Sequence, residues 1–333
     1  MTRASVTRAT VLGAGVAGLC VTAELLARGC AVTVLDPCPS PGPHGCSWWA
    51  GGMLAPFCEG ETAEEPVVRL GRRSADWWER QGATVHRCGT LVVAPGRDRR
   101  ELDRFARRVP EAERLDADAL AALEPDLAGR FDRALFVRDE GHLDPRAALA
   151  HLRARLERDG ATFVAGTEAP SGPDTLVFDC RGLAARDALA DLRGVKGEMV
   201  VLRSAEIRLA RPVRLLHPRF PLYVVPREGG LFMLGATQIE SDDRRRSVRA
   251  ALELLSAAYA LHPAFAEAEL LEHGADARPA FPDNLPRLRR RGDTILVNGL
   301  FRHGFLLAPV LARMAAEAAF DGTQPELMDE DHA

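Results

Sequence analysis

The sequence predicts an α/β fold in which one domain, made from separate segments of the chain, has a second domain inserted into it. Three observations support this fold. Residues 9–36 read as a strand, a glycine-rich turn, a helix and a second strand. Residues 293–320 read as a strand followed by a long apolar helix. Between these ends, residues 211–238 read as antiparallel strands with turn signals such as "REGG".

The first unit carries a glycine motif. "GAGVAG", Gly13 to Gly18, fits G-x-G-x-x-G, and an acid, Asp36, ends the next strand about 20 residues on. Gly13 permits the turn, and Gly15 lets the backbone approach a pyrophosphate. Gly18 lets the helix pack on the strand, while Asp36 accepts hydrogen bonds from the ribose hydroxyls. This context predicts a Rossmann-type dinucleotide-binding unit, although a glycine-rich turn without a ligand is the alternative. Its expected contacts are Gly13, Ala14, Gly15, Val16, Ala17, Gly18, Asp36 and Pro37.

The remaining segments complete the outline. We expect helices around 64–82 and 246–261, a charged helical region over 99–128, and strands over 88–95, 174–182 and 194–202. Residues 141–166 repeat the order of helix and then strand. The dinucleotide-binding domain is therefore expected at 1–85, 140–195 and 270–325, and the substrate domain at 86–139 and 196–269. The tail, 326–333, is expected to be frayed.

Composition narrows the class. An apolar content of 47% suits a globular core, and a net charge of −4 gives no field that favours nucleic acid. The seven cysteines include no C-x-x-C pair, so neither a metal site nor a disulfide framework is expected. No window is apolar enough to span a membrane, and no apolar leader begins the chain. We expect a cytoplasmic homo-oligomer.

The glycine motif does not distinguish NAD from FAD. Residues 46–59, "CSWWAGGMLAPFCE", combine small residues with paired glycines and so permit close approach to a large planar group. The closing helix begins at "HGFLLAP", which directs its N-terminal dipole toward the domain junction, where it can stabilise a reduced flavin. Arg302 and His303 interrupt this apolar run. Since a buried guanidinium requires an anionic partner, we expect Arg302 to face one.

Five segments, "VLGAGVAGL", "SWWAGGMLAP", "GATQIES", "RPAFPDNLP" and "RHGFLLAP", occur in this order. Together they resemble the FAD-dependent amine oxidases of the D-amino-acid oxidase family, and most closely the glycine oxidases of thiamine biosynthesis. The resemblance covers nearly the whole chain. It implies a noncovalent FAD and a substrate site between the flavin and an antiparallel sheet. The FAD contacts that follow are Ser47, Ala50, Gly51, Gly52, Met53, Arg181, Gly182, Arg302, His303, Gly304, Phe305 and Leu306.

The resemblance also assigns the substrate site. Arg278 matches the arginine that pairs with the substrate carboxylate, and Tyr223 matches a tyrosine that helps to hold it. Arg302 matches a second arginine near the flavin and the pocket mouth, and is expected to face the anionic substrate and the flavin edge. The alternative for Tyr223 is a core strand residue, and for Arg278 an anchor of the following turn. Met53, Gln238 and His303 are expected to line the substrate pocket.

Three further observations concern the substrate range, the need for a base and the attachment of the flavin. Gln238 stands where glycine oxidases tend to have methionine, so a more polar wall is expected to admit sarcosine or D-alanine. His303 is not expected to act as a base, because in this family a hydride leaves Cα and the amine enters deprotonated. Cys46 and Cys58 lie in the flavin segment, but neither matches a motif for covalent attachment.

The resemblance implies that glycine is oxidised to its imine, with oxygen as acceptor and hydrogen peroxide as product. The imine is hydrolysed to glyoxylate or handed to a thiazole synthase. Two alternatives remain at this stage. One is a D-amino-acid or secondary-amine dehydrogenase of the same fold that passes electrons to a carrier. The other is an NAD-binding or purely structural Rossmann protein without flavin.

Overall fold

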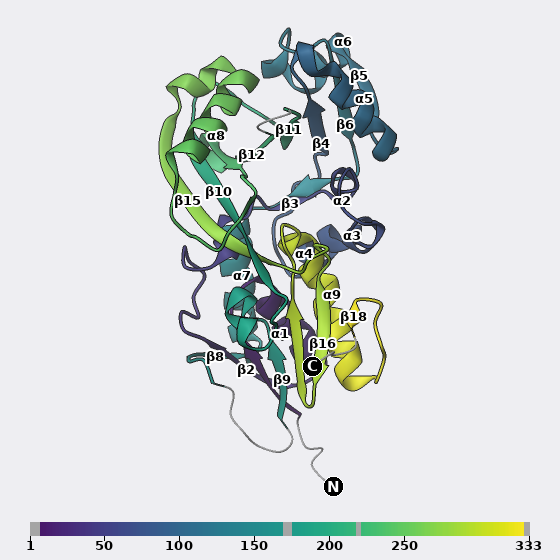
Figure 1. The fold of residues 1–333 in the computed structure, drawn as a ribbon, viewed down its shortest axis with the longest axis vertical. Helices are drawn as coiled ribbons and strands as arrows, with labels where there is room; N and C mark the ends of the chain where they lie inside the picture. Colours follow the sequence, from purple (N-terminus) through teal and green to yellow (C-terminus); the bar gives the residue numbers. More distant parts are fainter. Residues whose placement is uncertain (1–6, 169–174, 218–220, 330–333) are drawn as a thin grey trace.

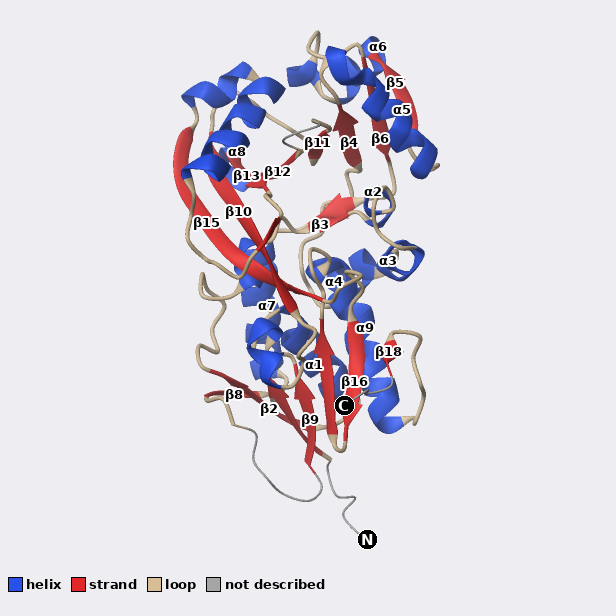
Figure 2. Cartoon of the chain, viewed as in Figure 1, coloured by secondary structure: helices blue, strands red, loops and turns tan. Residues whose placement is uncertain are grey.

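The computed structural model describes residues 7–168, 175–217 and 221–329. Two large sheets form the centres of two lobes, with helices packed around each (Figures 1 and 2). The first strand and the last long helix of the chain lie in the same lobe (Figure 1). The α/β organisation expected from the sequence is therefore present.

The first sheet has the order β18-β16-β17-β9-β1-β2-β8. Its interior strand β1 is parallel to both of its neighbours, β2 and β9. Because the glycine turn follows β1 directly, it lies at the carboxyl end of parallel strands, where open α/β sheets bind ligands. The strands are β1 (Arg8–Leu12), β2 (Ala31–Asp36), β8 (Thr162–Ala165), β9 (Thr175–Asp179), β16 (Arg287–Arg291), β17 (Thr294–Asn298) and β18 (Met328–Asp329).

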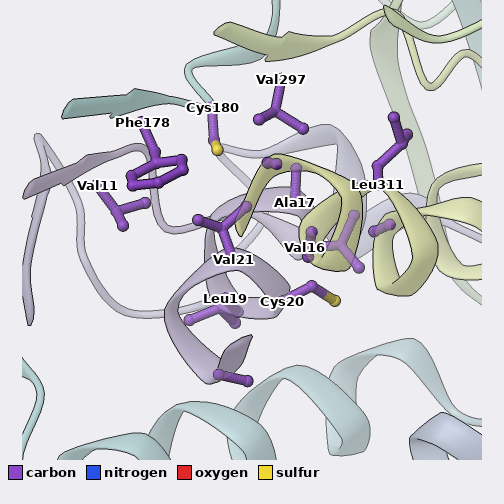
Figure 3. Close-up of a cluster of buried hydrophobic side chains, with 14 of the residues drawn as sticks. Val11, Val16, Ala17, Leu19, Cys20, Val21, Phe178, Cys180, Val297 and Leu311 are labelled. Carbon is purple, nitrogen blue, oxygen red and sulfur yellow. The ribbon is translucent and has the colours of Figure 1, made fainter. Parts of the chain in front are cut away.

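Apolar helices cover this sheet. Helix α1 (Val16–Ala27) packs against α9 (Gly304–Phe320) and α7 (Pro145–Arg158). Figure 3 shows side chains from α1 and α9 meeting those of β1, β9 and β17 in one cluster. The Asp144 carboxylate begins α7 by accepting from the backbone N–H groups of Arg146 and Ala147, at 2.8 and 3.2 Å. Residues from both ends of the sequence thus share one core.

The second sheet has the order β14-β10-β13-β12-β11-β4-β6-β5, with β15 paired to the other edge of β10. Its strands are β4 (Thr90–Val93), β5 (Glu113–Asp116), β6 (Arg133–Val137), β10 (Arg193–Arg203), β11 (Val213–Leu215), β12 (Leu222–Arg227), β13 (Leu231–Gly235), β14 (Ile239–Glu240) and β15 (Glu269–Ala280). A small pair, β3 (Met53–Leu54) and β7 (Gly141–His142), is separate from both sheets.

The remaining helices lie around the second sheet and the junction between the lobes. Helices α2 (Pro56–Glu59), α3 (Glu65–Gly71) and α4 (Ser74–Arg80) follow β3 along the chain. Helices α5 (Arg99–Arg108), α6 (Ala117–Leu123) and α8 (Val248–Leu261) lie in the upper lobe (Figure 1). No helix of the described residues is both long enough and apolar enough to cross a membrane.

Three details differ from the sequence-based outline. Residues 113–116 form strand β5 inside the region expected to be helical, because they pair along the edge strand β6. Residues 269–280 form one strand that pairs with β10 along its length, so the chain leaves the second sheet near 281 and not near 270. Met328 and Asp329 pair with β16 where a frayed tail was expected, and 330–333 lie outside the described residues.

The packing at Gly18 generates a stability prediction. A Cβ at Gly18 would lie 1.8 Å from the carbonyl oxygen of Gly13, and backbone atoms cannot easily move aside. We expect Gly18→Ala to lower the free energy of unfolding by about 1–3 kcal/mol, as overpacked sites do. Thermal melting followed by circular dichroism measures the change. Gly45→Ala is the matched control, because a Cβ there meets no atom within 4 Å. Equal melting temperatures for the two variants would contradict this account.

Candidate active site

A cavity of about 1160 Å³ lies where the two sheets approach each other. Its wall comes from the carboxyl ends of β1 and β2, the N-termini of α1 and α9, and strands of the second sheet. This volume exceeds that of most sites for small ligands, which span about 300–1,000 Å³. The cavity is therefore large enough for a cofactor together with a small substrate.

The glycine turn shapes one end of the cavity. Gly13 has φ of 96°, and a Cβ there would lie 2.6 Å from the carbonyl oxygen of Cys180. Any other residue at this position would be strained and would clash. At the start of α1, the Val16 N–H donates to Ser47 Oγ at 3.1 Å. The turn and the loop that contains Ser47 thus enclose the N-terminus of α1, a favourable place for a pyrophosphate.

Asp36 connects the glycine turn to the segment that follows β2 at this end of the cavity. One carboxylate oxygen accepts from the Ala14 N–H at 2.8 Å, and the other accepts from the Cys38 N–H at 2.7 Å. Asp36 lines the cavity, and a carboxylate has about four acceptor positions. Both oxygens can therefore still accept a hydrogen bond from a hydroxyl group, such as the ribose hydroxyls that the sequence leads us to expect.

Most of the residues expected to contact the cofactor line this one cavity. Ala14 and Gly18 are the two exceptions, since neither is among the lining residues. Gly18 packs beneath the turn, and Ala14 holds Asp36 through its N–H. The expected contacts found in the wall are Gly13, Gly15, Val16, Ala17, Asp36, Pro37, Ser47, Ala50, Gly51, Gly52, Met53, Arg181, Gly182, Arg302, His303, Gly304, Phe305 and Leu306.

Arg278 projects from β15 into the same cavity. Its guanidinium lies on Gly197 of β10, where a Cβ would be 2.0 Å from an Arg278 nitrogen. It donates to the Thr237 carbonyl oxygen over a long 3.4 Å, and no carboxylate of the described residues pairs with it. Burial lowers the pKa of Arg278, although Tyr223 and Cys46 oppose the shift. A half-buried guanidinium with so few partners is suited to bind a carboxylate.

Tyr223 stands beside Arg278. Its ring occupies the space over two glycines, because a Cβ at Gly51 would lie 2.7 Å from the ring and one at Gly235 2.8 Å from the hydroxyl oxygen. Burial raises the pKa of Tyr223, while nearby Arg278 lowers it in part. The hydroxyl therefore stays protonated at neutral pH and can donate a hydrogen bond into the cavity.

Arg302 differs from the expectation of a buried arginine. Its side chain is 30% exposed, and its Nε forms an ion pair with Glu59 Oε2 at 2.8 Å. A second nitrogen donates to Thr62 Oγ1 at 2.5 Å. Arg302 thus has an anionic partner within the protein, the Glu59 carboxylate, and its expected contact with the substrate and the flavin edge stays a prediction. The apolar neighbours of Arg302 in the sequence are buried, but its own side chain is partly exposed in the cavity wall.

Glu59 and Arg214 are site residues that the sequence analysis did not identify. Arg214 donates to Glu59 Oε1 at 2.9 Å, so Glu59 is shared between Arg214 and Arg302. Burial acts to raise the pKa of Glu59, but the two arginines outweigh it and lower the pKa to about 2. One feature of the sequence could have identified Arg214. In "VRL", 213–215, the charged residue stands between two apolar residues, and a strand therefore places Arg214 on the opposite face from them.

The remaining predicted pocket residues also line the cavity. His303 is buried and lies 3.5 Å from Glu59 Oε2 through its Nδ1. Burial lowers the pKa of His303 to about 4 against the opposing effect of Glu59, so its ring is neutral at pH 7. Gln238 is exposed at the rim, and Met53 is half-buried on β3. No cluster of metal-ligating side chains occurs in the described parts of the chain.

Comparison with known proteins agrees with this geometry. The family model described as "FAD dependent oxidoreductase" (DAO) matches residues 8–318. The protein of Rhizobium etli named "Putative thiamine biosynthesis oxidoreductase ThiO" is 55% identical over 323 residues, which cover 96% of this chain and 98% of that protein. A glycine oxidase of Pseudomonas aeruginosa is 28% identical, with 96% of each chain covered.

A crystal structure of glycine oxidase from Geobacillus kaustophilus superposes with a TM-score of 0.80 at 24% identity, over 96% of each chain. At this level of identity the superposition shows the fold alone. The fold class that the sequence predicts is confirmed by the family match and by this structure, and the FAD cofactor is confirmed by the family match. The chain belongs to the DAO family of FAD-dependent oxidoreductases.

Proposed function

We propose that this oxidoreductase converts glycine to its imine in thiamine biosynthesis, with oxygen as electron acceptor and hydrogen peroxide as product. The imine is hydrolysed to glyoxylate or handed to a thiazole synthase. The observation that carries the proposal is the half-buried guanidinium of Arg278, which opens on the cavity beside Tyr223 and has no carboxylate partner among the described residues. The names of the Rhizobium and Pseudomonas relatives support the same assignment.

The chain has the surfaces that FAD requires. The N-terminus of α1, enclosed by the glycine turn and Ser47, would hold the pyrophosphate, and Asp36 would hold the ribose. The N-terminus of α9, with Gly304, faces the cavity and would stabilise negative charge on the reduced ring. When bound, FAD would supply the acceptor for a hydride from the substrate and the route for electrons to oxygen.

Noncovalent binding is favoured by the state of the cysteines. Cys46 lines the cavity, but burial and the nearby Asp276 raise its pKa to about 11, although Arg278 opposes the shift. Cys58 is fully buried, and burial raises its pKa as well. Covalent attachment requires a nucleophilic thiolate, and both residues remain thiols at neutral pH.

Arg278 and Tyr223 position the substrate. A bidentate contact from the guanidinium fixes both oxygens of the amino acid carboxylate, and the Tyr223 hydroxyl adds a directional hydrogen bond. With the carboxylate fixed, Cα is held toward the flavin, and holding the reacting groups in place supplies a large share of the rate. The neutral His303 adds no charge beside the amine and is not needed as a base.

A substrate screen with coupled peroxide detection tests the proposal. Glycine should release hydrogen peroxide in amounts that match substrate consumed. Because Gln238 makes the rim polar and open, sarcosine and D-alanine should turn over at rates within about tenfold of the glycine rate. Turnover that requires an artificial electron carrier and produces no peroxide would instead identify a dehydrogenase.

Arg278→Ala should raise the KM for glycine more than tenfold while FAD stays bound. The loss of a buried charged contact to the substrate costs about 2–5 kcal/mol, and even the lower end of this range corresponds to a rise in KM of more than tenfold. Steady-state kinetics measures KM, and the absorbance near 450 nm measures bound flavin. Arg158→Ala, at an exposed position at the end of α7, is the matched control. An unchanged KM would remove Arg278 from the substrate site.

The pH dependence of kcat/KM tests the role of His303. Burial lowers its pKa to about 4, so its ring is already neutral in the folded protein between about pH 5.5 and 8. We expect no inflection from His303 in this range, and His303→Gln should keep the shape of the profile even where the absolute rate falls. An acid limb near pH 6–7 that disappears in the variant would show that His303 acts as a base.

A further inference from the structure

Arg227 is a largely buried arginine that the proposed chemistry does not use. It ends β12, four residues after Tyr223, so both side chains project from the same face of the strand. Its Nη2 donates to the carbonyl oxygen of Gly51 at 2.6 Å. The ring of Tyr223 lies over the same glycine, 2.7 Å from the position that a Cβ would take there. One strand therefore contacts Gly51 through two of its side chains.

The hydrogen bond from Arg227 fixes the direction of the next N–H group. The peptide between Gly51 and Gly52 is trans, and a trans peptide group directs its C=O and its N–H to opposite sides. Gly51 and Gly52 line the cavity, whereas Arg227 does not. The Gly51 oxygen therefore faces Arg227 behind the cavity wall, and the Gly52 N–H faces the cavity.

The Gly52 N–H has no acceptor within the described residues. Gly52 is buried, and its own carbonyl oxygen accepts from the Leu143 N–H at 2.9 Å, but no hydrogen bond from the Gly52 N–H occurs in these parts of the chain. Buried backbone N–H groups in folded proteins are almost always paired. An unpaired one in the wall of a cavity is thus available to a ligand.

The positive charge of Arg227 is only weakly compensated. Its side chain is 8% exposed, and the one carboxylate of the described residues within 4 Å is that of Asp144, 3.7 Å from Nε. His142 Nδ1 lies 3.3 Å from Nη1, but burial lowers the pKa of His142 to about 3, so this ring is neutral. Burial lowers the pKa of Arg227 to about 10 although Asp144 opposes the shift, so the guanidinium stays charged at neutral pH. A charge in such a site acts strongly on its neighbours.

We propose that Arg227 is a positioning residue that makes bound FAD easier to reduce. A hydride brings two electrons and one proton, so the flavin ring gains negative charge on reduction. Through the Gly51 carbonyl, Arg227 holds the Gly52 N–H as a donor toward the ring expected beside Tyr223, and its own charge acts in the same direction. Donors held in place in this way favour the state with more negative charge. This inference requires bound FAD but no particular amine substrate.

The reduction potential of the FAD-loaded enzyme tests this role. In Arg227→Met, the equilibrium constant for two-electron reduction of the bound FAD should fall at least tenfold, which lowers the midpoint potential by about 30 mV. Arg227→Lys keeps a positive charge and should stay within about threefold of the wild-type constant. Anaerobic titration against a reference dye, with no amine present, measures both values. A methionine variant with an unchanged constant, or a lysine variant no better than methionine, would overturn the proposal.

Arg211→Met is the matched control. The Arg211 side chain is 13% exposed and donates to the backbone carbonyl of Cys88 at 2.7 Å, but it does not line the cavity. Its loss should lower the melting temperature and leave the equilibrium constant for FAD reduction within about threefold of the wild type. Equal falls in the two methionine variants would show a general loss of packing and overturn the role of Arg227.

A measurement on the wild-type protein covers the case in which Arg227→Met fails to fold or to hold FAD. Gly-Gly pairs occur only at 51–52 and 229–230, so NMR-active isotopes in the glycine carbonyl carbon and amide nitrogen select Gly52 and Gly230. The Gly52 amide proton should move to lower field when FAD binds and again when FAD is reduced, because its hydrogen bond forms and then strengthens. Gly230, which does not line the cavity, should not respond to reduction. A Gly52 signal that is unchanged on reduction would overturn the proposal.

These readouts separate this inference from the proposed function. If the potential falls in Arg227→Met as expected and glycine releases no peroxide, the proposed function fails while the role of Arg227 stands. If glycine is oxidised and the potential does not change in the variant, the role of Arg227 fails alone.

Discussion

The pairing of β10 with β15 is the interaction on which the site depends. These two strands run from the upper lobe toward the first sheet (Figure 1), and their register places Val195 opposite Arg278. Two residues along β10, Gly197 has no side chain, and the guanidinium of Arg278 occupies the space left free. A shift of one residue would turn Arg278 to the other face of the sheet. Backbone pairing therefore sets the position of the charge that the proposed chemistry requires.

The cavity combines one polar end with one cationic end. At the first, backbone N–H groups, Ser47 and Asp36 form a surface typical of dinucleotide binding. At the other, Arg278 from β15, Arg214 from β11 and Arg302 just before α9 line the cavity together with Tyr223, and Glu59 pairs with Arg214 and Arg302. Charges held in place by the fold need little rearrangement when a substrate anion binds, which is how preorganised sites favour a reaction.

The sequence predicted those features that depend on local geometry. The glycine turn follows from φ and contact requirements at Gly13, and the α/β class follows from apolar periodicity at both ends. It could not predict that Glu59 meets Arg214, 155 residues away, because only the packed sheets bring them together. The exposure of Arg302 was misjudged, since an apolar segment does not reveal which way one side chain points. Strand β5 was missed because its pairing with β6, and not its charged composition, determines its conformation.

The strand order of the first sheet has a consequence for synthesis on the ribosome. Strand β1 ends at residue 12, but β9, its neighbour on one side, begins at 175, and β17, the next strand, begins at 294. One of the two helices that pack on α1, helix α9, ends only at Phe320. The nascent chain therefore carries an incomplete lobe, with part of the apolar surface of α1 uncovered, until residue 320 has left the exit tunnel. Capture of the flavin consequently follows the synthesis of α9.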